Sequence, residues 1–335
     1  MKYLCADAHL DLAYDVVRKR SMGQRRVLEH DYAPDMQAAG LCLVISSIYL
    51  EDDEIAGSAL EAGLEQVEAL LEDISESPSF FLIERKPDLE KLAENKTGIL
   101  LCFEGAEPVG KKLSMLSIFR RLGLSGAGLV WSRPNLLGAG SALHGEVCAD
   151  EPGLTPFGRT FIQEAARQSI FIDLAHLNDC GFWDAVKESA QPLMLSHGGC
   201  RALNPIARNS SDAQLKAIIA SDGFIGINAI NFILSDGKKI RENIYGYITH
   251  LKHVLTLGGE DNLGFGFDFN DQILAYVSGE HLASLPRLPF DCVKGYKQLP
   301  LLLEAMAEQG FTESQINKIS STNLIRFLRK VLPEK

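Results

Sequence analysis

Eight short apolar runs alternate with longer stretches of helical periodicity along this chain of 335 residues. Runs of this length are typical of β-strands that are buried on both faces, and helices between them allow the strands to be parallel. Eight such units predict a (β/α)8 TIM barrel, with a doubly wound open sheet as the alternative. The runs span residues 3–6, 41–48, 99–103, 126–131, 169–174, 193–196, 224–230 and 263–267.

The stretches between the runs carry apolar residues at helical spacing. The clearest, residues 60–74, places its apolar side chains on one stripe of an acidic segment. Further helices are expected at 160–168, 179–189, 211–221, 240–257 and from 301 to the C-terminus. Because no Pro-, Ser- or Gly-rich linker divides the chain, we expect one barrel domain over residues 1–335.

Polar side chains of two chemical kinds, imidazole and carboxylate, lie at or just past the ends of five of these runs. A barrel gathers residues from several strand ends at one face, so this placement favours the barrel over the open sheet. If the first run continues as a strand, its period of two places two of these side chains on one face. The candidates are His9, Asp11, Glu104, His176, His197 and Asp268.

Each candidate also has a plain structural interpretation. Asp11 and Asp268 could cap helices, with His9 on the surface, and Glu104 could form a structural salt bridge. His176 and His197 could each be a satisfied core histidine. Two histidines at like positions on consecutive strands are harder to explain in this way, because neighbouring strands lie about 5 Å apart and their ends can share one ion.

Together the candidates form two histidine–carboxylate half-sites with one carboxylate to spare, which suits a binuclear metal centre. Imidazole with carboxylate suits Zn²⁺ best, with Mn²⁺ or Co²⁺ as substitutes. Two such ions can hold a bridging hydroxide at neutral pH and polarise a carbonyl. The pattern therefore predicts metal-assisted hydrolysis with two zinc ions per chain.

Composition excludes several other classes of function. The net charge of −11 argues against a nucleic-acid partner or an anionic membrane surface. No long apolar segment suggests a membrane span or a signal peptide, so we expect a soluble, cytoplasmic protein. The seven cysteines form no CxxC pair, which predicts reduced thiols rather than disulfides. Cys200, three residues after His197, is a candidate thiol nucleophile, but thiol chemistry leaves the other candidates unexplained.

The motifs that carry these residues resemble those of the membrane (renal) dipeptidase family and its bacterial relatives. The similar segments are DAHLD at 7–11, EG at 104–105, GLTPFGR at 153–159, DLAHLND at 173–179, SHGGCRAL at 196–203, RNSSDAQL at 208–215, the run 250–270 and NLIRFLR at 323–329. They follow the order and spacing of that family over nearly the whole chain.

The resemblance implies a zinc dipeptidase and a role for each candidate. His9, Asp11 and Glu104 would hold one zinc ion, and Glu104 would bridge to a second ion held with the two later histidines, His176 and His197. Asp268 would serve as the proton shuttle. Arg208 would clamp the carboxylate of the dipeptide, a task that suits a bidentate guanidinium; the alternative is an arginine in solvent at the start of a helix.

The chain departs from the family pattern at a few positions. Leu10 replaces a common Asn, and Ala106 replaces the second Gly after the bridging glutamate. Trp131 stands where a substrate-facing histidine is common, and an indole N–H can only donate a hydrogen bond. We therefore expect Trp131 to contact the substrate, and we expect the accepted substrates to differ from those of family members with histidine at this position.

Two alternatives remain open at this point. An amidohydrolase-type barrel could act on another small amide or ester, although such barrels usually bridge their metals with a carboxylated lysine and the 126–131 run has none. A catalytically inactive metal-binding barrel is the second. The sequence leaves monomer and homodimer equally open.

Overall fold

The computed structural model describes residues 3–93, 95–148, 150–276 and 279–334. Eight parallel strands form a closed ring in the order β2, β1, β9, β8, β7, β6, β5, β4, and pairing of β2 with β4 closes it. The ring strands are β1 (Cys5–Leu10), β2 (Leu41–Ile48), β4 (Thr97–Glu104), β5 (Leu124–Gly128), β6 (Phe171–Asp173), β7 (Met194–Gly198), β8 (Phe224–Ile227) and β9 (Leu263–Phe265). The predicted (β/α)8 barrel is confirmed.

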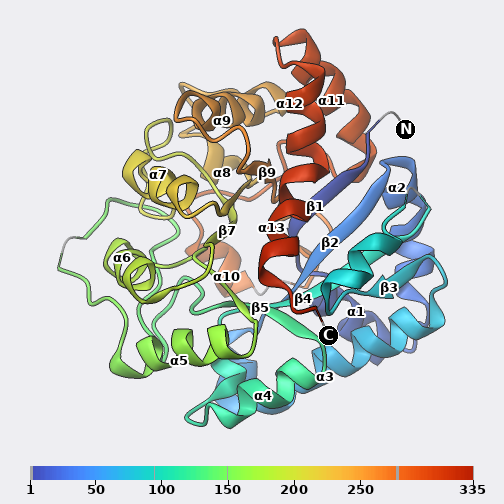
Figure 1. The fold of residues 1–335 in the computed structure, drawn as a ribbon, viewed down its shortest axis with the longest axis vertical. Coiled ribbons are helices and arrows are strands. Elements are labelled where there is room, and N and C mark those ends of the chain that lie inside the picture. Colours follow the sequence, from blue (N-terminus) through green and yellow to red (C-terminus); the bar gives the residue numbers. More distant parts are fainter. Residues whose placement is uncertain (1–2, 94, 149, 277–278, 335) are drawn as a thin grey trace.

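Helices surround the ring, as Figure 1 shows. In chain order they are α1 (Leu12–Ser21), α2 (Ala33–Ala38), α3 (Asp52–Glu76), α4 (Ser114–Arg121), α5 (Pro156–Arg167), α6 (Asp179–Glu188), α7 (Asp212–Ala220), α8 (Asn231–Leu234), α9 (Ile244–Thr256), α10 (Gly279–Ser284), α11 (Leu299–Glu308), α12 (Glu313–Asn317) and α13 (Asn323–Val331). No helix in the described ranges has both the length and the apolar character that crossing a membrane requires.

Capping residues start several helices soon after a strand ends. Asn178 accepts a hydrogen bond from the Gly181 N–H at the start of α6, and Ser211 forms a capping box with Gln214 at the start of α7. Such caps satisfy backbone N–H groups that have no partner inside the helix. They therefore fix where each loop between strand and helix ends.

Helix α13 covers one end of the barrel. Its Phe327 packs edge-on against Phe171 of β6, with ring centroids 5.5 Å apart, and Leu324 and Leu328 join the same buried cluster. The run expected from residue 301 is divided by a turn at Gly310, whose φ of +90° favours glycine, and by Thr312, which caps α12. This end is closed with side chains, so the opposite end is free to carry a site.

The first, fourth and seventh predicted strands differ most from the observed ones, and the seventh, expected at 224–230, ends at Ile227. Strand β1 continues to Leu10, because the buried Asp7 side chain accepts backbone N–H groups instead of ending the strand. His9 therefore lies inside the strand, while Asp11 follows it at the N-cap of α1. Asp11 thus lies one residue beyond the strand, but its side chain and that of His9 still belong to one group of donor atoms, as expected.

The strand expected at 126–131 ends at Gly128, and Trp131 lies on the loop after it. The Asn135 amide donates to the carbonyl oxygen of Leu129 at 2.8 Å and so folds this loop back on itself. A short additional strand, β3 (Phe80–Leu82), pairs with β4 outside the ring and was not expected from the sequence.

Candidate metal centre

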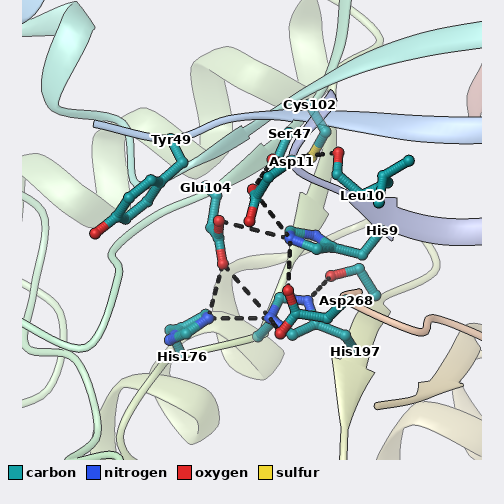
Figure 2. A network of polar contacts seen from close by, with 12 residues as sticks. His9, Leu10, Asp11, Ser47, Tyr49, Cys102, Glu104, His176, His197 and Asp268 are labelled. Atoms are coloured by element: carbon teal, nitrogen blue, oxygen red, sulfur yellow. Dashed lines mark hydrogen bonds and ion pairs between the residues drawn. The ribbon is translucent and has the colours of Figure 1, made fainter. Parts of the chain in front are cut away.

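The six predicted side chains lie together at the carboxyl end of the barrel, as Figure 2 shows. Each comes from a different strand end except His9 and Asp11, which share β1 and its exit. Glu104 is the last residue of β4, His197 lies in β7, and His176 and Asp268 follow β6 and β9. The structure thus brings all six side chains together at one end of the barrel.

Glu104 stands between two groups of imidazoles. Its Oε2 atom lies 3.5 Å from His9 Nε2, whereas Oε1 lies 2.9 Å from His176 Nε2 and 3.5 Å from His197 Nε2. The carboxylate is nearly buried in the site. Each of its oxygens therefore faces a different set of nitrogen donors.

The side of the site around His9 is rich in carboxylates. His9 Nε2 lies 3.7 Å from Asp11 Oδ1 and 3.8 Å from Asp268 Oδ1. Burial opposes protonation of His9, but the charges of Glu104, Asp11 and Asp268 together raise its pKa well above the usual value. Asp11 makes no capping bond to α1 and instead accepts a hydrogen bond from the Ser47 hydroxyl.

The side formed by His176 and His197 is neutral. Their Nε2 atoms lie 3.0 Å apart, and burial, together with the charge of Arg208, lowers the pKa of both imidazoles well below the usual value. Their Nδ1 atoms contact hydroxyls: Ser132 Oγ lies 2.8 Å from that of His176, and Ser196 Oγ lies 2.8 Å from that of His197. Both Nε2 atoms are thus directed toward Glu104.

This donor set fits divalent cations. His9 Nε2 is buried and has no hydrogen-bond partner, and on the other side the Nε2 atoms of His176 and His197 face each other and a carboxylate oxygen of Glu104. A cation on each side would take these lone pairs and offset the buried negative charge. The donor atoms form three groups within 4.8 Å: His9, Asp11 and Glu104; Glu104, His176 and His197; and His9, His197 and Asp268.

Asp268 lies against both sides of the site. Besides its contact with His9, its Oδ2 lies 3.8 Å from His197 Nε2 and accepts a hydrogen bond from the Asn228 amide at 2.8 Å. Its φ of +55°, like the +67° of His176, is unusual for a residue with a side chain, and such strain tends to occur at functional sites. Burial raises the pKa of Asp268 well above its usual value. The helix-capping interpretation does not apply to it.

A cavity opens to solvent beside the donor cluster, and four of its members, Asp11, Glu104, His176 and Asp268, line it. Arg208 lines it, is 5% exposed, and donates to the His197 carbonyl oxygen at 3.3 Å. Among the described residues no carboxylate lies within ion-pair distance of this guanidinium. Arg208 is therefore a buried residue of the cavity and not a surface arginine; the charges of Asp268, Glu104 and Asp173 act on it without direct ion-pair contact.

Trp131 also lines the cavity. Its ring stacks on His176 with centroids 5.6 Å apart and contacts the ring of Tyr49 at 5.4 Å. The Arg133 guanidinium lies 5.0 Å from the Trp131 ring centroid. Trp131 thus forms part of an aromatic wall beside the imidazoles.

Cys200 does not line this cavity. Its side chain is buried, burial raises the pKa of its thiol, and its backbone N–H donates to His250 Nδ1 at 3.0 Å. His250 is fully buried, and its Nε2 contacts the Leu234 carbonyl oxygen at 2.9 Å. Both residues therefore pack the structure away from the six donors.

Several polar residues around the site were not singled out from the sequence. Asn228, which holds Asp268, lies inside the run expected at 224–230, so the rule that selected residues at run ends passed over it; the observed strand ends one residue earlier, at Ile227. The hydroxyls of Ser47, Ser132 and Ser196 had no such signal. Asp173, which supports Ser196, appeared only as one letter of the DLAHLND segment.

Comparison with known proteins identifies relatives of the same architecture. The family model described as membrane dipeptidase (peptidase family M19) matches residues 1–333. A metallo peptidase from Rhodobacter sphaeroides, liganded with a phosphinate mimic of the dipeptide L-Ala-D-Ala, is 25% identical with a TM-score of 0.85, covering 98% of this chain and 99% of that one. The metallo peptidase dipeptidase AC is 26% identical with a TM-score of 0.86, covering 99% of both chains.

A curated relative, dipeptidase tcpJ of Claviceps purpurea, is 28% identical over 236 residues, which are 70% of this chain and 51% of that protein. The chain spans about half the length of two of the curated relatives that it matches. Together these comparisons support a metal-dependent dipeptidase, as the sequence motifs predicted. The match over nearly the whole length shows that the chain belongs to the membrane dipeptidase family, peptidase family M19.

Proposed function

We propose that this protein hydrolyses the amide bond of free dipeptides with two zinc ions. The observation that carries the proposal is the position of Glu104, whose two oxygens face separate groups of donors. We assign His9, Asp11 and Glu104 to one ion and Glu104, His176 and His197 to the other. Mn²⁺ or Co²⁺ would serve as substitutes.

Bound ions would polarise the amide carbonyl and make water a stronger nucleophile at neutral pH. The protein side chains would transfer the protons and hold the reacting groups in place. The Asp268 carboxylate would accept a proton at its Oδ1 or Oδ2 atom from the attacking water and pass it to the leaving amine. The Asn228 amide, which donates to Oδ2, would hold that carboxylate in place.

The rest of the cavity would bind the dipeptide. We assign the substrate carboxylate to Arg208, because a buried guanidinium without an anionic partner gains most from a ligand that carries one. The wall around Trp131 would contact a substrate side chain. Since an indole cannot take over the role of an imidazole, the set of accepted dipeptides should differ from that of relatives with histidine there.

We also propose a cytoplasmic location. The cysteines of the described residues are free, and most of them are buried, as expected for a reducing compartment.

A panel of dipeptides tests the proposed activity. Zinc-loaded protein should hydrolyse L,L or L,D dipeptides and leave N-blocked and longer peptides intact, and a chelator should abolish the activity until zinc is restored. Equal hydrolysis of blocked or cyclic amides would instead favour a broader amidohydrolase. Full metal loading with no hydrolysis of any substrate would favour an inactive barrel.

A further inference from the structure

Two buried aspartates, Asp7 and Asp173, make the same set of contacts at two places in the barrel. At β1, Asp7 Oδ1 accepts the N–H of His9 at 3.2 Å and the N–H of Phe267 at 2.9 Å. Phe267 immediately precedes Asp268. Asp7 thus fixes the backbone next to two residues of the donor cluster.

At β6, Asp173 repeats this arrangement. Its Oδ1 accepts the N–H of Ala175 at 3.1 Å and the N–H of Ser196 at 2.9 Å. Ala175 immediately precedes His176, and Ser196 immediately precedes His197. Each aspartate therefore ties the exit of its own strand to the neighbouring strand through the same oxygen.

The second oxygen makes the two aspartates different. Asp7 Oδ2 accepts the hydroxyl of Tyr296 at 2.8 Å. Asp173 Oδ2 instead contacts the hydroxyl of Ser196, whose Oγ also lies 2.8 Å from His197 Nδ1. Only Asp173 is connected through a hydroxyl to an imidazole of the donor cluster.

Counting protons fixes the direction of this chain of contacts. A serine hydroxyl has one proton, and an ionised carboxylate can only accept. The Ser196 proton therefore goes to Asp173, and Ser196 Oγ accepts from an N–H on His197 Nδ1. With its proton on Nδ1, a neutral His197 presents the lone pair of Nε2 to Glu104 and His176.

Tight packing around Ser196 fixes the position of its backbone and therefore of its hydroxyl. Ser196 is 1% exposed. A Cβ atom placed on Gly226 of β8 or on Gly266 after β9 would lie 1.9 or 1.8 Å from the Ser196 carbonyl oxygen, so only glycine allows this approach. The backbone that carries the hydroxyl is thus held by three strand ends.

We propose that Asp173 and Ser196 are positioning residues that set the tautomer and orientation of His197 for metal binding. This inference rests on the proposed function, in which His197 holds an ion. Carboxylates commonly orient metal-binding histidines by direct contact, whereas here the carboxylate acts through a hydroxyl. His176 differs in having Ser132 at its Nδ1, on a partly exposed loop.

Asp173→Asn gives the sharpest test because it reverses the direction of the hydrogen bonds that connect His197, Ser196 and residue 173. The amide nitrogen facing Ser196 would donate, Ser196 would donate in turn to His197 Nδ1, and the proton of His197 would move to Nε2, which then cannot bind metal. Affinity for the second ion should fall by about 10- to 100-fold or more. The measurement is competition between the protein and a chelator for Co²⁺, followed by the visible absorption of bound Co²⁺.

Asp7→Asn is the matched control, since it changes a carboxylate with the same two backbone contacts and no connection to an imidazole. It should keep wild-type affinity for the second ion. Ser196→Ala removes the hydroxyl without reversing the chain, so its loss of affinity should be smaller than that of Asp173→Asn. If Asp173→Asn fails to fold, the metal affinity of Ser196→Ala tests the positioning role by itself.

The outcomes separate this inference from the proposed function. Wild-type affinity for two ions in folded Asp173→Asn, or in Ser196→Ala, would overturn the positioning role while leaving the metal centre intact. An equal loss of affinity in Asp7→Asn would also overturn it, because the effect would then belong to any buried carboxylate. A wild-type protein that binds no Co²⁺ would overturn the metal centre itself.

Discussion

The two sides of the donor cluster share Glu104 but differ in charge. Around His9, the charges of Asp11, Glu104 and Asp268 raise the pKa of the imidazole in spite of burial. Around His176 and His197, burial lowers the pKa of both rings. One side places three carboxylates around a single imidazole, whereas the other places two imidazoles against a single carboxylate. The difference teaches that the two ions would meet different donor sets and should bind with unequal affinity.

The largest effect is expected from Glu104→Gln, which removes the carboxylate common to both sides. Metal content and dipeptide hydrolysis should fall together, toward the level of metal-free protein, because each side loses an anionic ligand. His197→Ala should instead empty mainly the neutral side. Metal analysis and activity assays on the same samples check both variants, and Glu104→Gln with two metals and full activity would show that Glu104 does not bridge.

Asp268→Asn should have the next largest effect. The substitution keeps the shape of the side chain and removes the proton acceptor that faces both sides of the site. We expect kcat to fall by roughly a hundredfold or more, with substrate binding largely kept. Steady-state kinetics separate the two parameters. A variant that loses affinity for substrate and keeps kcat would contradict the role of Asp268 in proton transfer.

Arg208→Ala tests the cavity beyond the donor cluster. Loss of a buried ion pair costs roughly 2 to 5 kcal/mol, so kcat/KM for free dipeptides should fall by tens- to thousands-fold. Dipeptides with an amidated C-terminus should be affected much less. If both kinds of substrate lose the same factor, the guanidinium does not bind the carboxylate.

The smallest effect is expected from Cys200→Ala. Cys200 is close to His197 in sequence but lies away from the cavity, so kcat/KM should stay close to wild type. The buried position predicts a modest stability loss of about 1 kcal/mol, measured by denaturant unfolding. An inactive Cys200→Ala enzyme that is indifferent to chelators would instead favour thiol chemistry.

The presence and order of the eight ring strands could be predicted from the sequence, because buried parallel strands appear as uninterrupted apolar runs. Once a barrel is assumed, polar residues such as Glu104 and His197 that close these runs must meet at one face. This reasoning, together with motif resemblance, found all six members of the donor cluster. It also singled out Arg208 and Trp131, both of which line the cavity.

The contacts that support the donors could not be predicted in the same way. The bond between Asp173 and Ser196 depends on the register between two strands, and sequence spacing carries no information about it. The extension of β1 depends on backbone N–H groups that reach Asp7 from β9, far along the chain. The place of Trp131 depends on a loop that Asn135 folds back.

Titration of metal-free protein with Zn²⁺ tests the central claim most directly, with bound metal and dipeptide hydrolysis measured on the same samples. We predict two ions per chain, with full hydrolysis only when both are bound. Saturation at one ion per chain, or full hydrolysis by the metal-free protein, would contradict a centre in which Glu104 joins two ions.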